Sequence, residues 1–212
     1  MIIKITPLQK KIAALRVEKN NYEKQRAEFV KNLSDKEIKT ILICKDIGIP
    51  FCPELKINMN FPRALDVPGI AEQAIRNCNA DLEETEGEHS DDICKVTGIK
   101  SDTKTSSFSK NHMKGFPNSH RGHISNVRSC HGKLKDGALR VMVTDQFRMK
   151  CHYFYIPKNV WQKWTIKGSG KNSSGAQPSG SISYTYNRET GTIAKLEPYR
   201  VDSFRELANK TD

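Results

Sequence analysis

The chain has 212 residues, enough for one large domain or two small ones. Lys and Arg number 35 against 24 Asp and Glu, and the formal net charge of +11 favours partners with dense negative charge. No run of consecutive apolar residues exceeds four, which excludes a membrane-spanning helix, and the first seven residues lack the apolar stretch of a secretion signal. We therefore expect a soluble, cytoplasmic protein with no membrane partner.

Residues 1–50 are predicted to form an N-terminal helical region. Thr6 is a suitable N-cap and Pro7 suits the first helical position, and a helix of about 25 residues should follow. Its apolar stripe consists of Leu8, Ile12, Leu15, Tyr22, Phe29 and Leu33. A capping box at residues 34–37 opens a second helix that ends near Gly48. Two helices joined by a tight turn are either a helix-turn-helix DNA reader or common scaffolding.

The middle of the chain shows an abrupt change in charge. Residues 48–69 contain four prolines and are predicted to be an ordered loop or short strands, followed by a helix over about 69–78. Residues 81–92 hold seven acids and no Lys or Arg. Residues 93–171 hold sixteen Lys and Arg against three acids, a surplus of thirteen that exceeds the net charge of the whole chain. A polyanion-binding surface is therefore expected in this segment.

The remaining elements are mostly strands. Strands are predicted over residues 92–96 and 99–104 around Gly98, over 139–143 and 147–156, and in a hairpin of 181–186 with 193–196. Residues 111–126 and 167–175 are predicted to be loops, and residues 204–207 a short helix. This order predicts an α/β (α+β) fold, a single domain over 1–212 with a central mixed β-sheet flanked by helices. Its parts are the helical region 1–50, a core over 69–165 and a C-terminal hairpin and helix over 166–212.

The six cysteines are scattered and form no Cys-x-x-Cys pair, so free thiols are expected in a reducing compartment. Cys130-His131 and Cys151-His152 together offer four zinc ligands. Adjacent residues on a strand point to opposite faces, however, and this spacing is poor for a zinc site.

Asp92, Asp102 and Lys104 form the set most suggestive of chemistry. On a strand, Asp102 and Lys104 share one face, and the strand that begins near Asp92 is expected to lie beside them. Two neighbouring carboxylates favour a divalent cation, and Mg²⁺ takes one or two carboxylates while it accepts phosphate oxygens. A lysine beside them can orient a water aimed at phosphorus. The arrangement suits phosphodiester hydrolysis.

Asp91-Asp92, followed after nine intervening residues by Asp102-Thr103-Lys104, resembles the PD-(D/E)xK signature of type II restriction endonucleases and related nucleases. The resemblance implies that Asp92, or alternatively Asp91, is the first aspartate, that Asp102 is the second acid and that Lys104 is the lysine. Glu72 on the preceding helix would match the glutamate that often contributes to the metal site. It also implies a restriction-endonuclease-like fold with residues 69–165 as the catalytic core.

The function implied by this resemblance is a Mg²⁺-dependent, sequence-specific endonuclease that acts on double-stranded DNA as a homodimer. Products would carry 5′-phosphate and 3′-hydroxyl ends. Asp92, Asp102 and Glu72 would be metal ligands, and Lys104 would position the attacking water. The expected DNA contacts come from the polar, basic segment downstream: Lys114, Asn118, His120, Arg121, His123, Arg128, Lys133 and Lys135.

Two alternatives remain open. The segment from His120 to His123 resembles the Asp-Arg-Gly-His motif of ββα-metal nucleases, with His123 as general base and His120 in place of the aspartate. The other alternative is a nucleic-acid-binding protein without catalysis, because the basic segment alone would bind a polyanion.

Overall fold

The computed structural model describes residues 42–43, 67–85, 90–128, 133–168 and 180–211. The chain divides into two compact units, Met1–Ile38 and Lys39–Asp212, and all described residues belong to the second. Most of the predicted helical region 1–50 and the loop over 48–66 therefore lie outside the described residues. Leu42 and Ile43, in the predicted second helix, are helical and buried.

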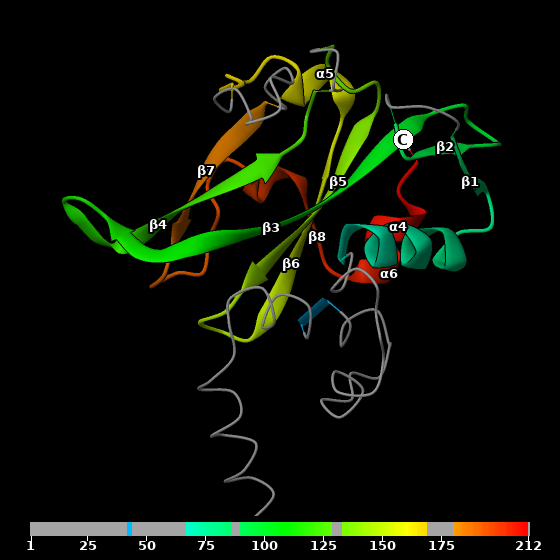
Figure 1. Ribbon diagram of the computed structural model, residues 1–212. Helices are drawn as coiled ribbons and strands as arrows, with labels where there is room; N and C mark the ends of the chain where they lie inside the picture. The colour runs from blue at the N-terminus through cyan, green and yellow to red at the C-terminus, as the bar shows by residue number, and fades with distance from the viewer. Residues whose placement is uncertain (1–41, 44–66, 86–89, 129–132, 169–179, 212) are drawn as a thin grey trace, which may run out of the picture. The chain divides into compact units, whose positions relative to one another are not determined.

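A mixed β-sheet dominates the second unit (Figure 1). Its main path runs in the order β1 (Leu82–Glu84), β2 (Asp92–Cys94), β3 (Lys100–Met113), β5 (Ala138–Asp145), β6 (Lys150–Ile156) and β8 (Arg200–Val201). β4 (Phe116–Ser125) pairs with β3 and with β7 (Ser181–Asn187). β3 and β5 are parallel and the other named pairs are antiparallel, so the predicted mixed sheet and the α+β class are confirmed.

β3 belongs both to the main path of the sheet and to the branch formed by β4 and β7, and this arrangement determines where the candidate site lies. β2 pairs with the start of β3, with Asp92 opposite Ser101. β4 pairs with β3 from Phe108 onward, whereas β5 pairs with residues 101–107. Asp102 and Lys104 therefore lie on a stretch of β3 between the end of its pairing with β2 and the start of its pairing with β4.

The two faces of β5 pack against different layers. Leu139, Val141 and Val143 contribute to a buried cluster with residues of β4 and β7, including Ile124 and Ile182. On the opposite face, Arg140 donates a hydrogen bond from Nε to the carbonyl oxygen of Leu207 in α6 (Phe204–Asn209). All eight residues of β5 are buried, as expected for a central strand covered on both faces.

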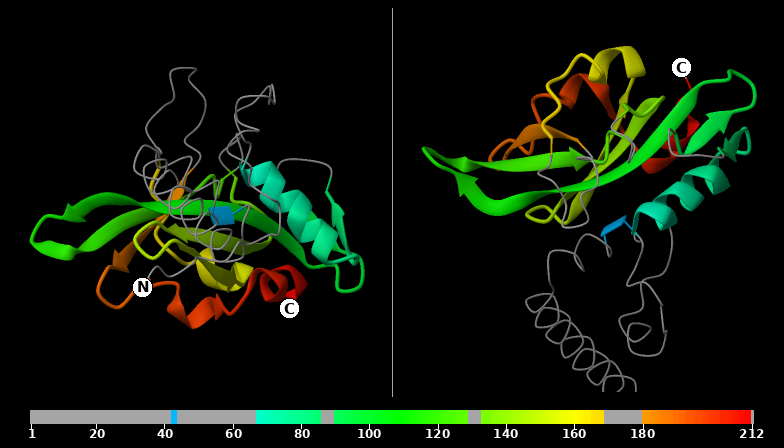
Figure 2. Two further views of the ribbon diagram at one scale, coloured as in Figure 1. Left: turned by 90° about the horizontal axis from the view of Figure 1, so that it is seen from below. Right: turned by 45° about the horizontal axis from the view of Figure 1, so that its top comes forward.

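Short helices complete the described part. α4 (Val67–Cys78) and α6 lie side by side in the views of Figures 1 and 2, and the side-chain amide of Asn79, just after α4, donates to the carbonyl oxygen of Ala208. α5 (Lys158–Trp161) follows β6, and a 3₁₀-helix, η1 (Glu197–Tyr199), precedes β8. No helix among the described residues is long and apolar enough to cross a membrane.

Several predicted elements are confirmed: the helix over 69–78, the strands that begin near residues 92, 99 and 139, the strand over 181–186 and the helix over 204–207. The strand predicted to begin at residue 147 begins at Lys150, after a turn.

Two predictions were wrong. Residues 111–126 are not a loop: they contain the end of β3 and all of β4, in which buried His120, Gly122 and Ile124 alternate with exposed residues. Residues 193–196 are not a strand, because the turn after β7 closes with a single bridge between Asn187 and Thr192 and leads into η1. β7 takes β4 as its partner instead.

Candidate functional site

The β2–β3 hairpin determines which aspartate faces Asp102. The chain turns at residues 95–98, where Gly98 has a φ of 70° that suits glycine, and this turn places Asp92 opposite Ser101. Asp91 immediately precedes β2, and its carboxylate lies close enough to Asp102 to raise the pKa of that residue. The amide of Asp91 donates to the carbonyl oxygen of Ser101 at 2.9 Å, which holds it beside β3.

The Asp91 carboxylate reaches the backbone of β3. Its Oδ2 accepts a hydrogen bond from the amide of Thr103 at 2.7 Å and lies 4.0 Å from Nζ of Lys104. The side chain of Asp91 is 17% exposed, so it lies at the boundary between the sheet and solvent. Asp91 therefore borders the site at its accessible side.

Asp102 is the buried carboxylate of the site. Its Oδ2 lies 2.5 Å from Nζ of Lys104, and its Oδ1 lies 3.4 Å from Nζ of Lys135. Burial raises the pKa of Asp102 to about 7, against the lowering effect of Lys104, and the nearby Asp91 raises it further. The raised pKa reflects first the burial of the carboxylate and then the neighbouring charge of Asp91, which together outweigh the effect of the two lysines.

Glu72 lies on α4 and belongs to the same electrostatic group. Burial raises its pKa to about 7, and the next largest cause is the negative charge of Asp91. Asp92 and Asp102 raise it as well, whereas Lys104 lowers it. The prediction that Glu72 accompanies the other acids agrees with this arrangement.

Asp92 has a different environment from the one predicted for it. It is fully buried, and its Oδ1 accepts a hydrogen bond from Nη1 of Arg76 at 2.9 Å. Its other oxygen has no hydrogen-bond partner among the described residues, and burial raises its pKa despite Arg76. Since alternate residues of a strand point to opposite faces, Asp92 lies on the face of Ser101 rather than on that of Asp102. The geometry thus favours Asp91, the alternative, as the carboxylate beside Asp102.

The donor set of the site fits Mg²⁺. Among the described residues there is no cluster of three or more His, Cys, Asp or Glu side chains that could hold a metal ion. Mg²⁺ needs only one or two protein carboxylates, because it keeps several waters and accepts phosphate oxygens. Asp91 and Asp102 supply two such carboxylates, and a cation between them would offset the burial and the repulsion from Asp91 that together raise the pKa of Asp102.

Lys135 has a role that its sequence context did not predict. It was expected to contact DNA, but its ammonium group lies beside Asp102 and its side chain is only 14% exposed. The amide of Lys135 donates to the carbonyl oxygen of Val127, and this hydrogen bond holds the backbone of Lys135 against the segment after β4. Arg76, the partner of Asp92, was also missed, although it lies four residues after Glu72 and therefore on the same side of α4.

His120 does not lie where a DNA contact requires it. It is 2% exposed and packs among Phe108, Phe147 and Tyr186, with ring centroids 4.9–6.2 Å away. The prediction that it contacts DNA does not fit this burial. It is on the same face of β4 as buried Gly122 and Ile124, which pack toward the core.

The other residues predicted to contact DNA vary in exposure. Lys114, Asn118, Arg121, His123 and Lys133 are exposed, and Arg128 is half-buried.

His123 lacks the surroundings of a metal-site base. Its Nδ1 lies 3.1 Å from Oγ of Ser183 on β7, and burial, Arg121 and Lys167 lower its pKa. In the described residues after His123, the chain runs through the rest of β4 into β5 without the helix that a ββα arrangement needs.

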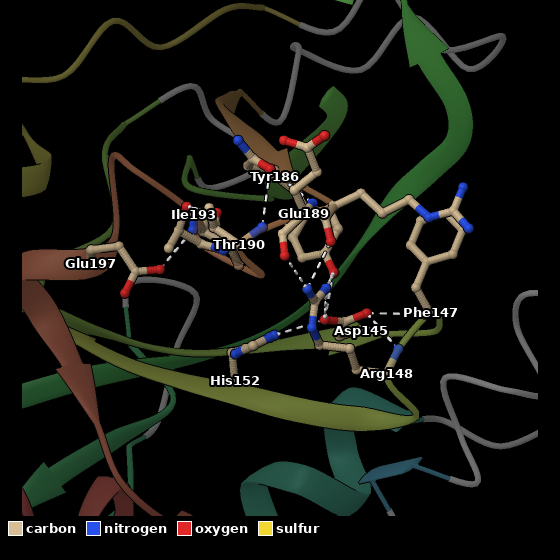
Figure 3. Close-up of polar contacts among 12 residues, drawn as sticks. Asp145, Phe147, Arg148, His152, Tyr186, Glu189, Thr190, Ile193 and Glu197 are labelled. Atoms are coloured by element: carbon tan, nitrogen blue, oxygen red, sulfur yellow. Dashed lines mark hydrogen bonds and ion pairs between the residues drawn. The ribbon is translucent and has the colours of Figure 1, made fainter. Parts of the chain in front are cut away.

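A second polar cluster surrounds Asp145, at the end of β5 (Figure 3). Its Oδ2 accepts hydrogen bonds from Tyr186 at 2.6 Å and from His152 Nε2 at 3.1 Å, while its Oδ1 accepts from the amides of Phe147 and Arg148. His152 contacts Arg200 through its other nitrogen, so it is not available as the zinc ligand considered above. Because these groups are buried and partnered, the cluster ties β5, β6 and β7 together and is structural.

A pocket of about 620 Å³ lies near the start of β3, lined by residues that include Lys100, Asp136, Tyr155 and Lys158. Lys100 and Lys158 both form ion pairs with Asp136. This pocket holds a single carboxylate between two lysines, whereas the group around Asp102 brings several carboxylates together.

The group formed by Asp91, Asp102, Lys104, Glu72 and Lys135 is therefore the candidate site. No family model matches the chain, and no curated protein matches it.

Proposed function

We propose that the chain is a Mg²⁺-dependent endonuclease for double-stranded DNA, similar to type II restriction enzymes of the PD-(D/E)xK superfamily. The observation that carries the proposal is that Lys104 on β3 lies within 4.0 Å of two carboxylates, those of Asp102 and of Asp91 just before β2. Lys135, 3.4 Å from Asp102, and Glu72, whose pKa is raised by burial and by Asp91, belong to the same group, which suits in-line attack by water on phosphorus.

Each residue has a defined part in the proposed reaction. Asp91 and Asp102 would hold Mg²⁺, which when bound polarises the phosphate and supplies an acidic water. Lys104, whose ammonium lies 2.5 Å from Asp102, orients the attacking water and takes part in moving its proton. The ammonium group of Lys135 contacts Oδ1 of Asp102, the oxygen that Lys104 does not contact, and offsets the charge of the carboxylates when the cation is absent. Glu72 would contribute to a second cation or to a proton transfer through water.

The proposed enzyme acts as a homodimer. The two strands of a duplex are related by a local two-fold axis, so a symmetric pair of subunits presents one site to each strand. The helix predicted over residues 8–33, the expected contact surface, lies outside the described residues. Sedimentation of the protein on DNA should give a protein mass of twice the 24.0 kDa chain. A protein mass of one chain on cleavable DNA would contradict the dimer but not the active site.

A digest of high-complexity genomic DNA tests the proposed activity, with Mg²⁺, with chelator and with Ca²⁺. Discrete fragments with 5′-phosphate ends should appear with Mg²⁺ alone. Lys104→Ala should abolish them, whereas Lys100→Ala is the matched control, because Lys100 is on the same strand but pairs with Asp136. If the protein binds the DNA but does not cut it with Mg²⁺, the result favours the non-catalytic binding protein and overturns the proposal. Undiminished cutting by Lys104→Ala would overturn the assignment of the site.

A further inference from the structure

The hairpin of β3 and β4 extends beyond the rest of the described chain in both views of Figure 2. Its tip is a tight turn at Lys114 and Gly115, with Met113 opposite Phe116 and a φ of 81° at Gly115. β7 pairs with β4 from Ser119 onward, and His112 pairs with His120, so only the tip over residues 113–118 consists of β3 and β4 alone; residues 109–118 are here called the arm. The tip of the arm is thus a two-stranded ribbon, whose base is contacted by Thr185 of β7 at Met113 and by Glu189 at Asn118.

The surface of the arm combines one large apolar group with polar and cationic ones. Phe116 is 63% exposed at the tip, and Asn111, His112 and Lys114 are exposed beside it. The sequence has no acid from Thr103 to Lys135 but seven Lys and Arg residues. An isolated exposed phenylalanine is ordinary on a protein surface. Its place at the tip of a projecting ribbon in an acid-free segment is what favours a polyanionic partner with an apolar element.

We propose that the arm enters the major groove of duplex DNA, with Phe116 against thymine methyl groups and Asn111 and His112 facing base edges. The inference rests on the proposed function and names the surface that reads the substrate. A two-stranded β-ribbon fits the width of the major groove, and thymine presents a methyl group there that phenylalanine side chains contact. Lys114 is placed for a phosphate at the rim of the groove.

The length of β3 fixes how far this contact lies from the reacting phosphate. Nine residues separate Lys104 from Met113 on the one strand, and at about 3.3 Å per residue they span at most about 30 Å. Register shifts near His112 shorten this distance. The arm therefore contacts the duplex within about one helical turn of the cut.

Phe116→Ala tests the arm, with Val96→Ala as matched control, because Val96 is also an exposed apolar residue in a hairpin turn. DNA binding is measured in Ca²⁺. The probe is a duplex of about four helical turns, taken from a genomic fragment that the full-length protein binds. We expect Phe116→Ala to weaken binding about tenfold, as for losing roughly half the burial of one phenylalanine, and Val96→Ala to bind within about twofold of the unchanged protein. Uracil lacks the methyl group of thymine. Replacing the contacted thymines by uracil should therefore lower the DNA affinity of the unchanged protein, but should lower that of Phe116→Ala little further.

Methylation interference gives a second, independent measurement on the unchanged protein. Methyl groups at guanine N7, in the major groove, should block binding within about one turn of the cut, whereas those at adenine N3, in the minor groove, should not. Interference at adenine N3 alone would overturn the proposal. Equal DNA affinity of Phe116→Ala and the unchanged protein would also overturn the proposal. If Phe116→Ala changed the oligomeric state while DNA affinity stayed the same, the arm would bind a second copy of the chain and not DNA.

These outcomes separate the two proposals. If the chain binds DNA through the arm in Ca²⁺ but never cuts in Mg²⁺, the endonuclease proposal fails and the arm stands. If Phe116→Ala binds and cuts as the unchanged protein does, the arm fails and the endonuclease stands.

Discussion

The clearest consequence of the hairpin register is that two adjacent aspartates should respond oppositely to the same substitution. Asp91→Asn removes the charge of the carboxylate that faces Asp102, but the amide oxygen can still accept the Thr103 hydrogen bond. Asp92→Asn leaves the site intact but weakens the buried contact with Arg76.

The magnitudes follow from these contacts. Loss of one metal ligand should slow cleavage by at least about a hundredfold, since the bound cation contributes several kcal/mol to the transition state. The unfolding midpoint of Asp91→Asn should stay within about 2 °C of the unchanged protein. Asp92→Asn weakens a charge-assisted hydrogen bond at a fully buried position, which costs at most about 2 kcal/mol, because the neutral amide also relieves the burial penalty that raises the pKa of Asp92. That corresponds to a fall of at most about 4–8 °C.

The assay combines two measurements on both variants. Single-turnover cleavage at saturating protein reports the chemical step, and thermal unfolding followed by circular dichroism reports stability. Asp91→Asn should be folded and inactive, and Asp92→Asn less stable and active at a temperature where it is folded. The opposite result, with Asp92→Asn folded and inactive and Asp91→Asn active, would refute the register argument and restore Asp92 as the ligand.

Three other outcomes are expected. Lys104→Met should keep Mg²⁺ affinity within about tenfold but lose cleavage, since lysine orients water and is not a ligand; unchanged cleavage would contradict that role. Because burial raises the pKa of Glu72 and Asp102 to about 7, Mg²⁺ affinity measured by calorimetry should rise with pH, by about tenfold per unit for each group below pH 7, and Glu72→Gln should reduce the slope. A flat profile would count against both groups. Although burial opposes it, hydrogen bonds from His152 and Tyr186 lower the pKa of Asp145 to about 2, so about 2 kcal/mol of stability, present above pH 4, should disappear as the pH falls toward 2; acid unfolding of Asp145→Asn should lack that component.

The sequence by itself predicted the elements that local patterns control. Gly98 marked the turn between β2 and β3, and the alternation on β3 placed Asp102 and Lys104 on one face. The helix predicted over residues 69–78 carries Glu72 and is present as α4. Each of these features depends on residues within about ten positions of one another, where the periods of helix and strand apply.

Only the tertiary structure decided between Asp91 and Asp92, because a shift of one residue in strand register moves a side chain to the opposite face. It also brought Lys135 beside Asp102 through the connection from β4 to the parallel strand β5, a contact that no local pattern encodes. His120 is buried because β4 pairs with β7, some sixty residues later, and aromatic side chains cover that face. Polar composition predicted a loop there, since the alternation of a strand is weak when the buried positions hold His and Gly and the partner strand is distant in sequence.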